Sequence, residues 1–330
     1  MFFPAMDSTR RQALRRFSAG LVGLGAAAAL GGCADIIPQG LGLALTPSPL
    51  TDPPVFNFAL NLEYLEAEYY QRGVNGVGLP PELIGPNPRP VIGGRQVTFQ
   101  TPYVREFLAE IAYDEFNHVR FLRQTIHASP LIEISRPEID LTNSFRKVGA
   151  AAGLGDNFDP FADEASFLLG AFLFEDVGVT AYIGGSDLIA GPDSAEAAAG
   201  ILAVEAYHGG LIRTQIADMG PAMVAKADAI SAARSATESP DNRREHIGTY
   251  SGPVRERGIG QGQGDIFPGE VIVAPTDAQG RCFARPPQDI LNIVYLDPTE
   301  GIDRGGFFPR STQGVVTHSL NDTHSNVRSA

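Results

Sequence analysis

The sequence predicts an all-α protein whose main part is a four-helix bundle with one long crossover connection. Four long segments have apolar residues at the spacing of an α-helix, at about 55–72, 102–128, 161–183 and 191–219. A long mixed stretch, 129–160, separates the second segment from the third and is expected to form the crossover. Each of the four segments also carries one glutamate within its apolar stripe, which is the third observation.

Glycine and proline mark where these helices begin and end. The first pattern, "VFNFALNLEYLEAEYYQR", is expected to end at Gly73, before a Gly/Pro-rich loop over 73–100 with a short hairpin near "VIGGRQV". Pro102 is a favourable residue for the first turn of the second helix. The third helix is expected to end at Gly184-Gly185, and the fourth to begin near Gly191-Pro192-Asp193. A shorter helix is expected to follow over 221–236.

Beyond the predicted bundle (54–220) the composition changes. After about Ala236 the chain is polar and Gly-rich, and two short β-type runs follow, "EVIVAP" (270–275) and "DILNIVYL" (289–296). Because two short strands are rarely stable alone, residues 221–330 are expected to form an irregular extension with short β segments, packed on the bundle. About ten residues at the end are expected to be disordered.

The first 32 residues have the pattern of a twin-arginine-type lipoprotein signal peptide. Arg10-Arg11 precede an uncharged run from Phe17 to Leu30, which is too short to span a bilayer as a helix. The run ends in "LGGC", which resembles a lipobox with Cys33 as the lipidated residue, and residues 33–53 are expected to be a tether. The alternative is a plain secretory signal followed by an incidental cysteine. Either signal predicts export to the periplasm or cell envelope.

The net charge and the number of cysteines exclude some classes of partner and fold. The chain of 330 residues has a formal net charge of −13, so it has no bulk electrostatic attraction for nucleic acid, and no nucleic-acid partner is expected. With only two cysteines, Cys33 and Cys282, a disulfide framework is not indicated. If the signal peptide is cleaved and Cys33 is lipidated, the lipid on Cys33 would hold the protein to the membrane.

The polar residues within the apolar stripes repeat on alternate helices. The first and third helices share the pattern Glu-x6-Tyr, and the second and fourth share Glu-x2-His, which places both side chains on one helix face. The positions are Glu63, Tyr70, Glu175 and Tyr182 in the first pair, and Glu115, His118, Glu205 and His208 in the second. Two helical hairpins with the same polar residues, folded with pseudo-twofold symmetry, would bring four carboxylates and two imidazoles to one point in the core.

Such a cluster of carboxylates favours a bound cation. Four buried carboxylates repel one another and would mostly be protonated without one. Two divalent ions bridged by carboxylates would neutralise them, and one imidazole would complete each coordination sphere. Oxygen-rich ligation with open positions favours iron or manganese over a closed structural zinc site.

The phrases "ALNLEYLEAEYYQRG", "DEFNHVRFLR" and "FARPPQDILNIVYL…GGFFP" resemble the ferritin-like superfamily, and within it the branch named after desiccation-related proteins. The resemblance covers about residues 54–220. It implies a ferritin-like four-helix bundle and carries six metal-ligand positions over to this chain: Glu63, Glu115, His118, Glu175, Glu205 and His208.

Other readings of the same residues stay open. The buried carboxylates could pair with Arg123 and Arg213, although both are rotated away from the ligand face. Tyr70 and Tyr182 are either hydrogen-bond donors to carboxylates or core aromatics, and Glu66 is a candidate extra ligand. Three acidic residues next to or near the predicted ligands are expected in solvent: Glu68, Asp114 and Asp176. The remaining histidines are expected on the surface: His127, His246, His318 and His324. Cys282 is expected to have no chemical role.

Two functions from different classes follow from this site. The first is an envelope protein with a dinuclear iron or manganese centre that oxidises ferrous ion or removes peroxide or O2. In it Glu63 and Glu175 are terminal ligands, Glu115 and Glu205 bridge, and each histidine binds one ion. The alternative is a non-catalytic desiccation or stress protein with a structural metal site. In either case a monomer or small homo-oligomer is expected, not a storage cage.

Overall fold

The computed structural model describes residues 53–127, 133–238, 257–260, 271–276 and 279–319. The predicted signal peptide, the lipidation site at Cys33, the tether, most of the polar stretch after Ala236 and the C-terminal end lie outside these residues. The described part is mainly helical, as the sequence predicts, with two short strands.

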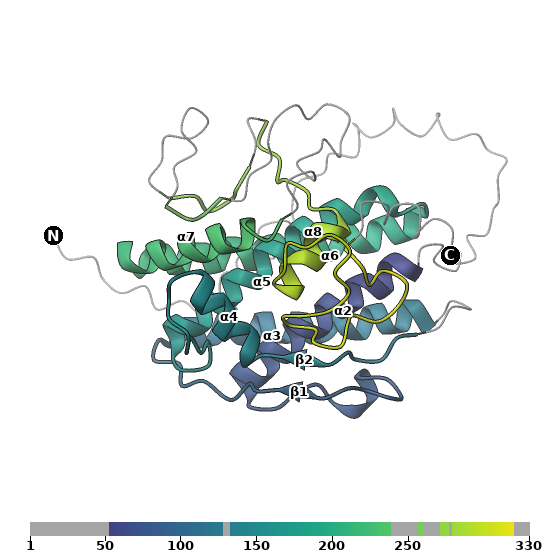
Figure 1. Cartoon of the computed structure of the whole chain (residues 1–330), viewed down its shortest axis with the longest axis horizontal. Helices are drawn as coiled ribbons and strands as arrows, with labels where there is room; N and C mark the ends of the chain where they lie inside the picture. Colours follow the sequence, from purple (N-terminus) through teal and green to yellow (C-terminus); the bar gives the residue numbers. More distant parts are fainter. Residues whose placement is uncertain (1–52, 128–132, 239–256, 261–270, 277–278, 320–330) are drawn as a thin grey trace, which may run out of the picture. The chain divides into compact units, whose positions relative to one another are not determined.

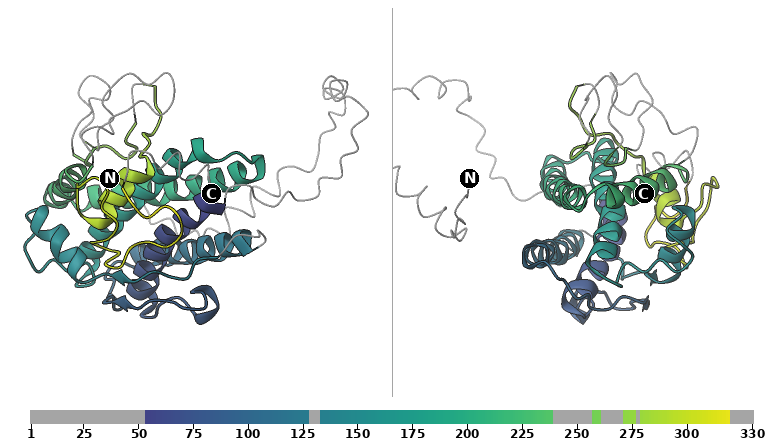
Figure 2. Two further views of the ribbon diagram at one scale, coloured as in Figure 1. Left: turned by 45° about the vertical axis from the view of Figure 1, so that its right-hand side comes forward. Right: turned by 90° about the vertical axis from the view of Figure 1, so that its left-hand side faces the viewer.

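Two helical hairpins form the bundle. The first consists of α2 (Pro53–Tyr70) and α3 (Pro102–His127), and the second of α5 (Glu164–Gly185) and α6 (Pro192–Asp218). Figures 1 and 2 show the α5–α6 hairpin, in teal and green, above the α2–α3 hairpin, in purple and blue. The helices contact each other most extensively within each hairpin, and α2 also packs on α5. The four-helix bundle with one long crossover is therefore confirmed.

Helix α5 runs through the middle of the core. Asp163 caps its N-terminus by accepting a hydrogen bond from the Ser166 N–H at 2.7 Å. The segment Glu164–Leu188 is long and apolar enough to cross a membrane, but 83% of its most apolar window is buried inside the bundle. That burial is typical of the central helix of a globular core.

The first helix does not end at Gly73. Its last turn widens into a π-helix, Gln71–Asn75, and the chain turns at Gly76, whose φ of 75° is left-handed. A Cβ on Gly73 would lie 2.0 Å from the ring of Phe167. Glycine at this position therefore serves close packing against α5 and not helix termination.

The expected hairpin near "VIGGRQV" is wrong. Strand β1 (Val91–Ile92) pairs in parallel with β2 (Ile139–Asp140), which belongs to the crossover. The crossover also contains helix α4 (Asn143–Ala151), which the sequence interpretation missed. Short 3₁₀ turns complete the connections at Pro81–Leu83 and Ser186–Leu188. The two-strand sheet thus ties the first long loop to the crossover.

The C-terminal extension is largely helical where it is described. Helix α7 (Pro221–Ser235) follows α6 as expected, but "DILNIVYL" forms helix α8 (Pro287–Tyr295) and not a strand. Every residue of α8 is buried, and a short continuous apolar run cannot distinguish a buried strand from a buried helix. Residues 271–275 form no strand either.

The extension packs on α5 through both of its helices. A Cβ on Gly184 would lie 1.7 Å from the carbonyl oxygen of Arg285, so glycine is needed where the extension crosses α5. The backbone N–H of Arg285 donates to Thr180 O at 3.0 Å in the same place. Gly184 therefore has a packing role in addition to marking the end of the helix.

Candidate metal centre

The four bundle helices bring the six predicted ligand residues together. Each helix contributes one glutamate, and α3 and α6 each add a histidine one turn later. All four glutamates have 0% exposed surface, and the histidines are nearly as buried. The residues are Glu63 on α2, Glu115 and His118 on α3, Glu175 on α5, and Glu205 and His208 on α6.

His118 faces three carboxylates. Its Nδ1 lies 3.2 Å from Glu63 Oε2, 3.5 Å from Glu205 Oε1 and 3.6 Å from Glu115 Oε1. A single ring nitrogen therefore points at the centre of a carboxylate cage formed by three helices.

His208 faces a second set of carboxylates. Its Nδ1 lies 3.2 Å from Glu115 Oε1 and 3.3 Å from Glu175 Oε2. The centroids of the two imidazole rings are 6.3 Å apart. Ligand atoms of Glu115, Glu175, Glu205 and His208 lie within 4.8 Å of one another, as do those of Glu63, Glu115, His118 and Glu205. The two groups share Glu115 and Glu205, so each group of four could hold a cation and the groups overlap at these two carboxylates.

The hydrogen bonding of the cluster is incomplete in the way that a metal site requires. Both carboxylate oxygens of Glu115 and of Glu205 form no hydrogen bond, and neither does Glu175 Oε2. His208 Nδ1 also lacks one. Buried polar atoms without partners are costly, so ligands in need of a cation explain this cluster better than a structural polar core.

The pKa values of the carboxylates diverge. Burial raises the pKa of Glu63 to about 7, against the lowering effect of His118. Burial also raises the pKa of Glu205 well above its ordinary value, and the charge of Glu115 adds to this rise. For Glu115 itself, burial raises the pKa, but His118 and His208 outweigh it, so its pKa falls below the usual range.

Burial acts in the opposite direction on the pKa values of the histidines, but the neighbouring carboxylates raise them. Burial alone lowers the pKa of His118, but the charges of Glu63 and Glu115 outweigh it and raise that pKa well above the ordinary value. Binding of a cation by these residues would therefore release protons.

Two tyrosines hold the outer carboxylates. Tyr70 donates a hydrogen bond to Glu175 Oε1 at 2.5 Å, and Tyr182 donates one to Glu63 Oε1. Each hydrogen bond therefore links α2 and α5 across the bundle at a glutamate of the cluster, which favours a donor role for the tyrosines over that of plain core aromatics.

Glu66 borders the cluster. It is buried, and its pKa is raised well above the ordinary value by burial and by the nearby charges of Glu205 and Glu115. A Cβ on Gly178 would lie 2.1 Å from Glu205 Oε2 and 3.4 Å from Glu66 Oε1. Glycine on α5 therefore leaves the space in which these two carboxylates meet.

Asp114 was expected in solvent, but it contacts the site. Its Oδ2 lies 3.3 Å from His208 Nε2, the ring nitrogen that faces away from the carboxylates. A carboxylate on the outer nitrogen fixes the ring and its tautomer. The repeat could not reveal this residue, because Val204 occupies the equivalent position before Glu205.

We expect Asp114→Asn to weaken metal binding at the His208 half of the site by roughly 10- to 100-fold, because the imidazole loses its anionic partner. Competition of the purified variant against a chelator of known affinity measures this change. Glu106→Gln removes an exposed charge from the same helix and should leave affinity unchanged. Equal affinity of the Asp114 variant and wild type would contradict a role for Asp114 in orienting His208.

Two further carboxylates expected in solvent are in fact buried ion-pair partners. Glu68 is 0% exposed and pairs with Arg72 at 2.8 Å and with Arg136. Asp176 pairs with Arg213 at 2.9 Å and with Arg234 at 2.8 Å. Arg72 lies one helical turn from Glu68, but the other three partners lie on other elements and meet these carboxylates only on folding.

The ion-pair alternative for the cluster itself finds no support in the arginine contacts. Arg123 donates to Tyr64 Oη and pairs with Glu133, and Arg213 pairs with Asp176. Neither arginine has a contact of this kind with the six cluster residues. Of the remaining residues, His127 and His318 are exposed as expected and Cys282 is half-buried, whereas His246 and His324 lie outside the described residues.

Comparison with known proteins places this geometry in a family context. The model of the ferritin-like domain matches residues 51–218. A desiccation-related protein, PCC13-62 from Craterostigma plantagineum, is 37% identical over 172 residues, 50% of this chain and 53% of that protein. The chain thus spans about half the length of that relative.

A second relative matches more of the chain. The ferritin-like catalase Nec2 from Nesocodon mauritianus is 29% identical over 274 residues, 80% of this chain and 84% of that protein. No solved structure gives a significant match.

Proposed function

Because the chain belongs to the family of ferritin-like domains, in its desiccation-related branch, we propose that its carboxylate–histidine cluster binds two iron or manganese ions and removes hydrogen peroxide. The observation that carries this proposal is the pair of overlapping ligand groups that share Glu115 and Glu205. The similarity to a protein named as a ferritin-like catalase favours peroxide as the substrate.

The residues divide between two ion positions. Glu63 and His118 would hold the first ion and Glu175 and His208 the second, with Glu115 and Glu205 bridging. When bound, the pair of ions would supply the two-electron redox capacity by which two molecules of H2O2 become two of H2O and one of O2.

The protein side chains prepare this reaction in three ways. The hydrogen bonds from Tyr70 and Tyr182 orient the terminal carboxylates, and Asp114 orients His208. The complete burial of the glutamates excludes bulk water, which strengthens electrostatic interactions within the site. The side chain of Asp114 is 33% exposed, so it can pass protons between solvent and the His208 ring.

Oxygen release from H2O2 by the metal-loaded protein tests the proposal. The protein is purified without chelator and loaded anaerobically with Mn(II) or Fe(II), and O2 is followed with an electrode. We expect O2 at half the amount of peroxide consumed, and only background release from Glu63→Ala/Glu175→Ala. Ferrous oxidation is measured in the same samples. A protein that binds two ions and turns over neither substrate would contradict the redox proposal and favour a structural metal site.

The N-terminal pattern supports a proposal on location. Export through the twin-arginine signal and lipidation of Cys33 would place the protein on a membrane of the cell envelope as a monomer or small homo-oligomer. Cys33→Ser should move the protein from the membrane fraction to the soluble fraction. Equal membrane association of the two forms would contradict the lipid anchor.

A further inference from the structure

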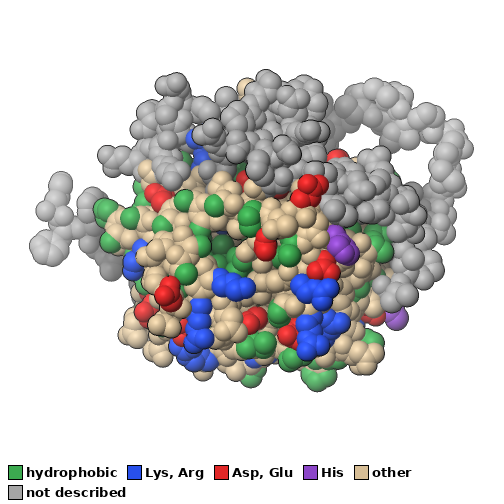
Figure 3. All heavy atoms as spheres, in the orientation of Figure 1, with side chains coloured by type: hydrophobic (Ala, Val, Ile, Leu, Met, Phe, Trp, Pro, Cys, Tyr) green, Lys and Arg blue, Asp and Glu red, His purple; other side chains and the backbone are tan. Residues whose placement is uncertain are grey.

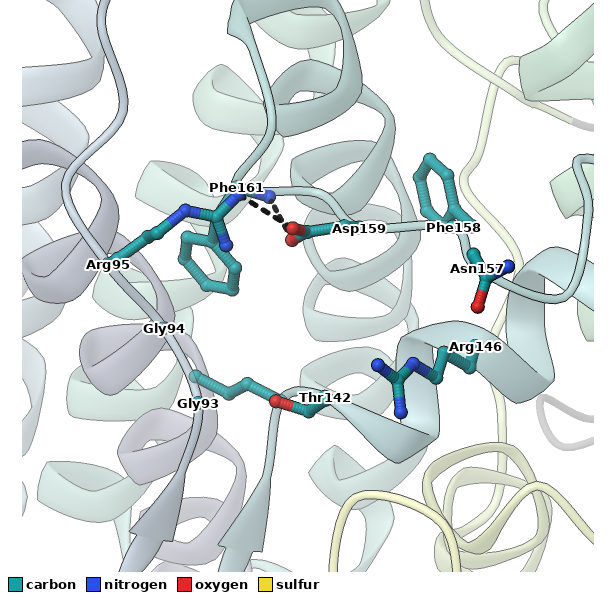
Figure 4. A pocket seen from close by; sticks show the side chains of 10 residues that line it. Gly93, Gly94, Arg95, Thr142, Arg146, Asn157, Phe158, Asp159 and Phe161 are labelled. Atoms are coloured by element: carbon teal, nitrogen blue, oxygen red, sulfur yellow. Dashed lines mark hydrogen bonds and ion pairs between the residues drawn. The ribbon is translucent and has the colours of Figure 1, made fainter.

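A cavity of about 370 Å³ lies among the loops that flank the bundle and shares no residue with the carboxylate–histidine cluster. Three segments line it: the stretch after β1, the start of α4 and the loop that leads into α5 (Figure 4). Its volume is within the range of small-molecule pockets in proteins. All of its lining residues belong to the described part of the chain.

The charge in this cavity is not balanced. Arg95 is ion-paired with Asp159 at 2.7 Å, so these two charges largely neutralise each other. Arg146 extends its guanidinium from α4 toward the hollow, as Figure 4 shows. Its side chain forms neither a hydrogen bond nor an ion pair with any of the described residues. The lining therefore carries one uncompensated positive charge with five N–H donors.

The backbone adds further donors. Gly93 and Gly94 have left-handed φ values of 84° and 81°, a conformation that favours glycine. Within the described residues their N–H groups have no hydrogen-bond partner, and neither does the Thr142 hydroxyl. A Cβ on Gly93 would lie 2.1 Å from Thr142 Oγ1, so the glycine backbone itself forms this wall. Donors outnumber acceptors here, since the only carboxylate, Asp159, is already paired.

The remaining wall is apolar. Phe158 is half-buried and Phe161 is buried, and both line the cavity. Figure 4 shows the ring of Phe161 beside the hollow and the ring of Phe158 turned away from it. An aromatic or aliphatic body can pack against Phe161 while its charged end meets Arg146. Lys and Arg side chains, interspersed with Asp and Glu, lie on the lower half of the face in Figure 3, the half in which Figure 1 labels β1, β2 and α4. They are exposed there although the chain as a whole has a net charge of −13.

We propose that this cavity binds a small organic anion, with its carboxylate or phosphate group on Arg146 and the Gly93–Gly94 backbone and its apolar body against Phe161. The site is separate from the candidate metal centre, so its occupant is a second ligand and not the redox substrate.

Isothermal titration of the whole chain with benzoate and with phenyl phosphate tests this site, and neutral benzamide of similar size is the control probe. We expect saturable binding of at least one anion and none of benzamide, and the two anions distinguish a carboxylate ligand from a phosphate ligand. Arg146→Gln should weaken binding by roughly 10- to 100-fold, the usual effect of losing a charge-assisted hydrogen bond.

Lys147→Gln is the matched control, because it removes the same charge from the next position of α4, which is also exposed but does not line the cavity. It should bind as wild type does. Arg146 is exposed, so its variant should keep the wild-type melting temperature. The proposal would be overturned by absence of anion binding in the wild type, by equal binding of benzamide, or by equal losses in the two variants.

Discussion

Replacing Glu115 and Glu205 together by alanine is expected to abolish metal binding at both positions of the candidate centre. These two residues belong to both ligand groups, so their removal leaves each ion with one carboxylate and one histidine. Wild type, purified without chelator, should contain about two equivalents of iron or manganese, the number such paired sites hold. Elemental analysis of the variant should show a value near zero.

Stability gives a second readout of the same variant. A ligand that binds only the folded state at 100 times its Kd adds about 2.7 kcal/mol per site. The melting temperature of wild type should therefore rise with added Mn(II), and that of the variant should not. Since binding displaces protons from Glu63, Glu205 and the imidazoles, wild-type affinity should increase with pH.

Glu106→Ala/Glu196→Ala is the matched control for this experiment, because it removes two exposed carboxylates from the same helices, α3 and α6. It should bind metal as wild type does. A folded wild type without bound metal, even after anaerobic addition of Fe(II) or Mn(II), would eliminate both the redox and the structural-metal functions.

Asp176→Ala is expected to destabilise the fold more than any other single carboxylate substitution outside the cluster. Asp176 is the shared acceptor of Arg213 and Arg234, all three of which are buried. Removing one partner from a buried ion pair leaves an uncompensated charge and costs about 3–5 kcal/mol. Chemical denaturation of the metal-free protein measures this loss.

The substitution of Asp176 should also weaken the packing of the C-terminal extension on the bundle. Arg213 also donates to the carbonyl oxygens of Gly258 and Ile272, and Arg234 to that of Phe172. The ion pairs of Asp176 with Arg213 and Arg234 thus join α5, α6 and α7 to the segments around Gly258 and Ile272. Asp218→Ala, an exposed site at the end of α6, should change stability by about 0.5 kcal/mol or less. Similar losses of stability in the Asp176 and Asp218 variants would contradict this role of the buried ion pairs of Asp176.

The contribution of Asp176 should depend on pH. Burial raises its pKa, but Arg213 and Arg234 outweigh this and hold the pKa below the ordinary value of 3.8. The unfolded state therefore binds the proton first as pH falls. The stabilisation is present above about pH 3.8 and is lost as pH falls toward the lower pKa of the folded state. Asp176→Asn should flatten this part of the acid-unfolding profile relative to wild type.

Helical period and residue type were sufficient to locate the bundle and the six polar positions in its core. A glutamate in an apolar stripe is costly wherever that stripe is buried, so Glu63 or Glu175 indicates a site before any tertiary contact is known. The repeat of Glu-x2-His on α3 and α6 also indicates that the two helical hairpins pack together with these residues facing each other. These signals are local in sequence, because neighbours on a helix face lie three or four residues apart.

The remaining features depend on contacts between distant segments. The parallel pairing of Val91 with Ile139 and the helical state of 287–295 depend on packing that no local pattern specifies. The same holds for the acidic residues next to two of the cluster glutamates. Asp114 meets an imidazole of α6, and Asp176 meets arginines of α6 and α7.

The sequence by itself therefore determined where the four bundle helices run, which apolar stripe each of them buries and that the core contains carboxylates in need of cations. Only the tertiary structure decided which buried charges meet one another, since an ion pair between helices depends on the relative placement of elements far apart in the chain. It also decided that Arg146 has no partner among the described residues. The physical reason is that burial follows from periodicity, whereas the partner of a buried charge is set by how the helices pack.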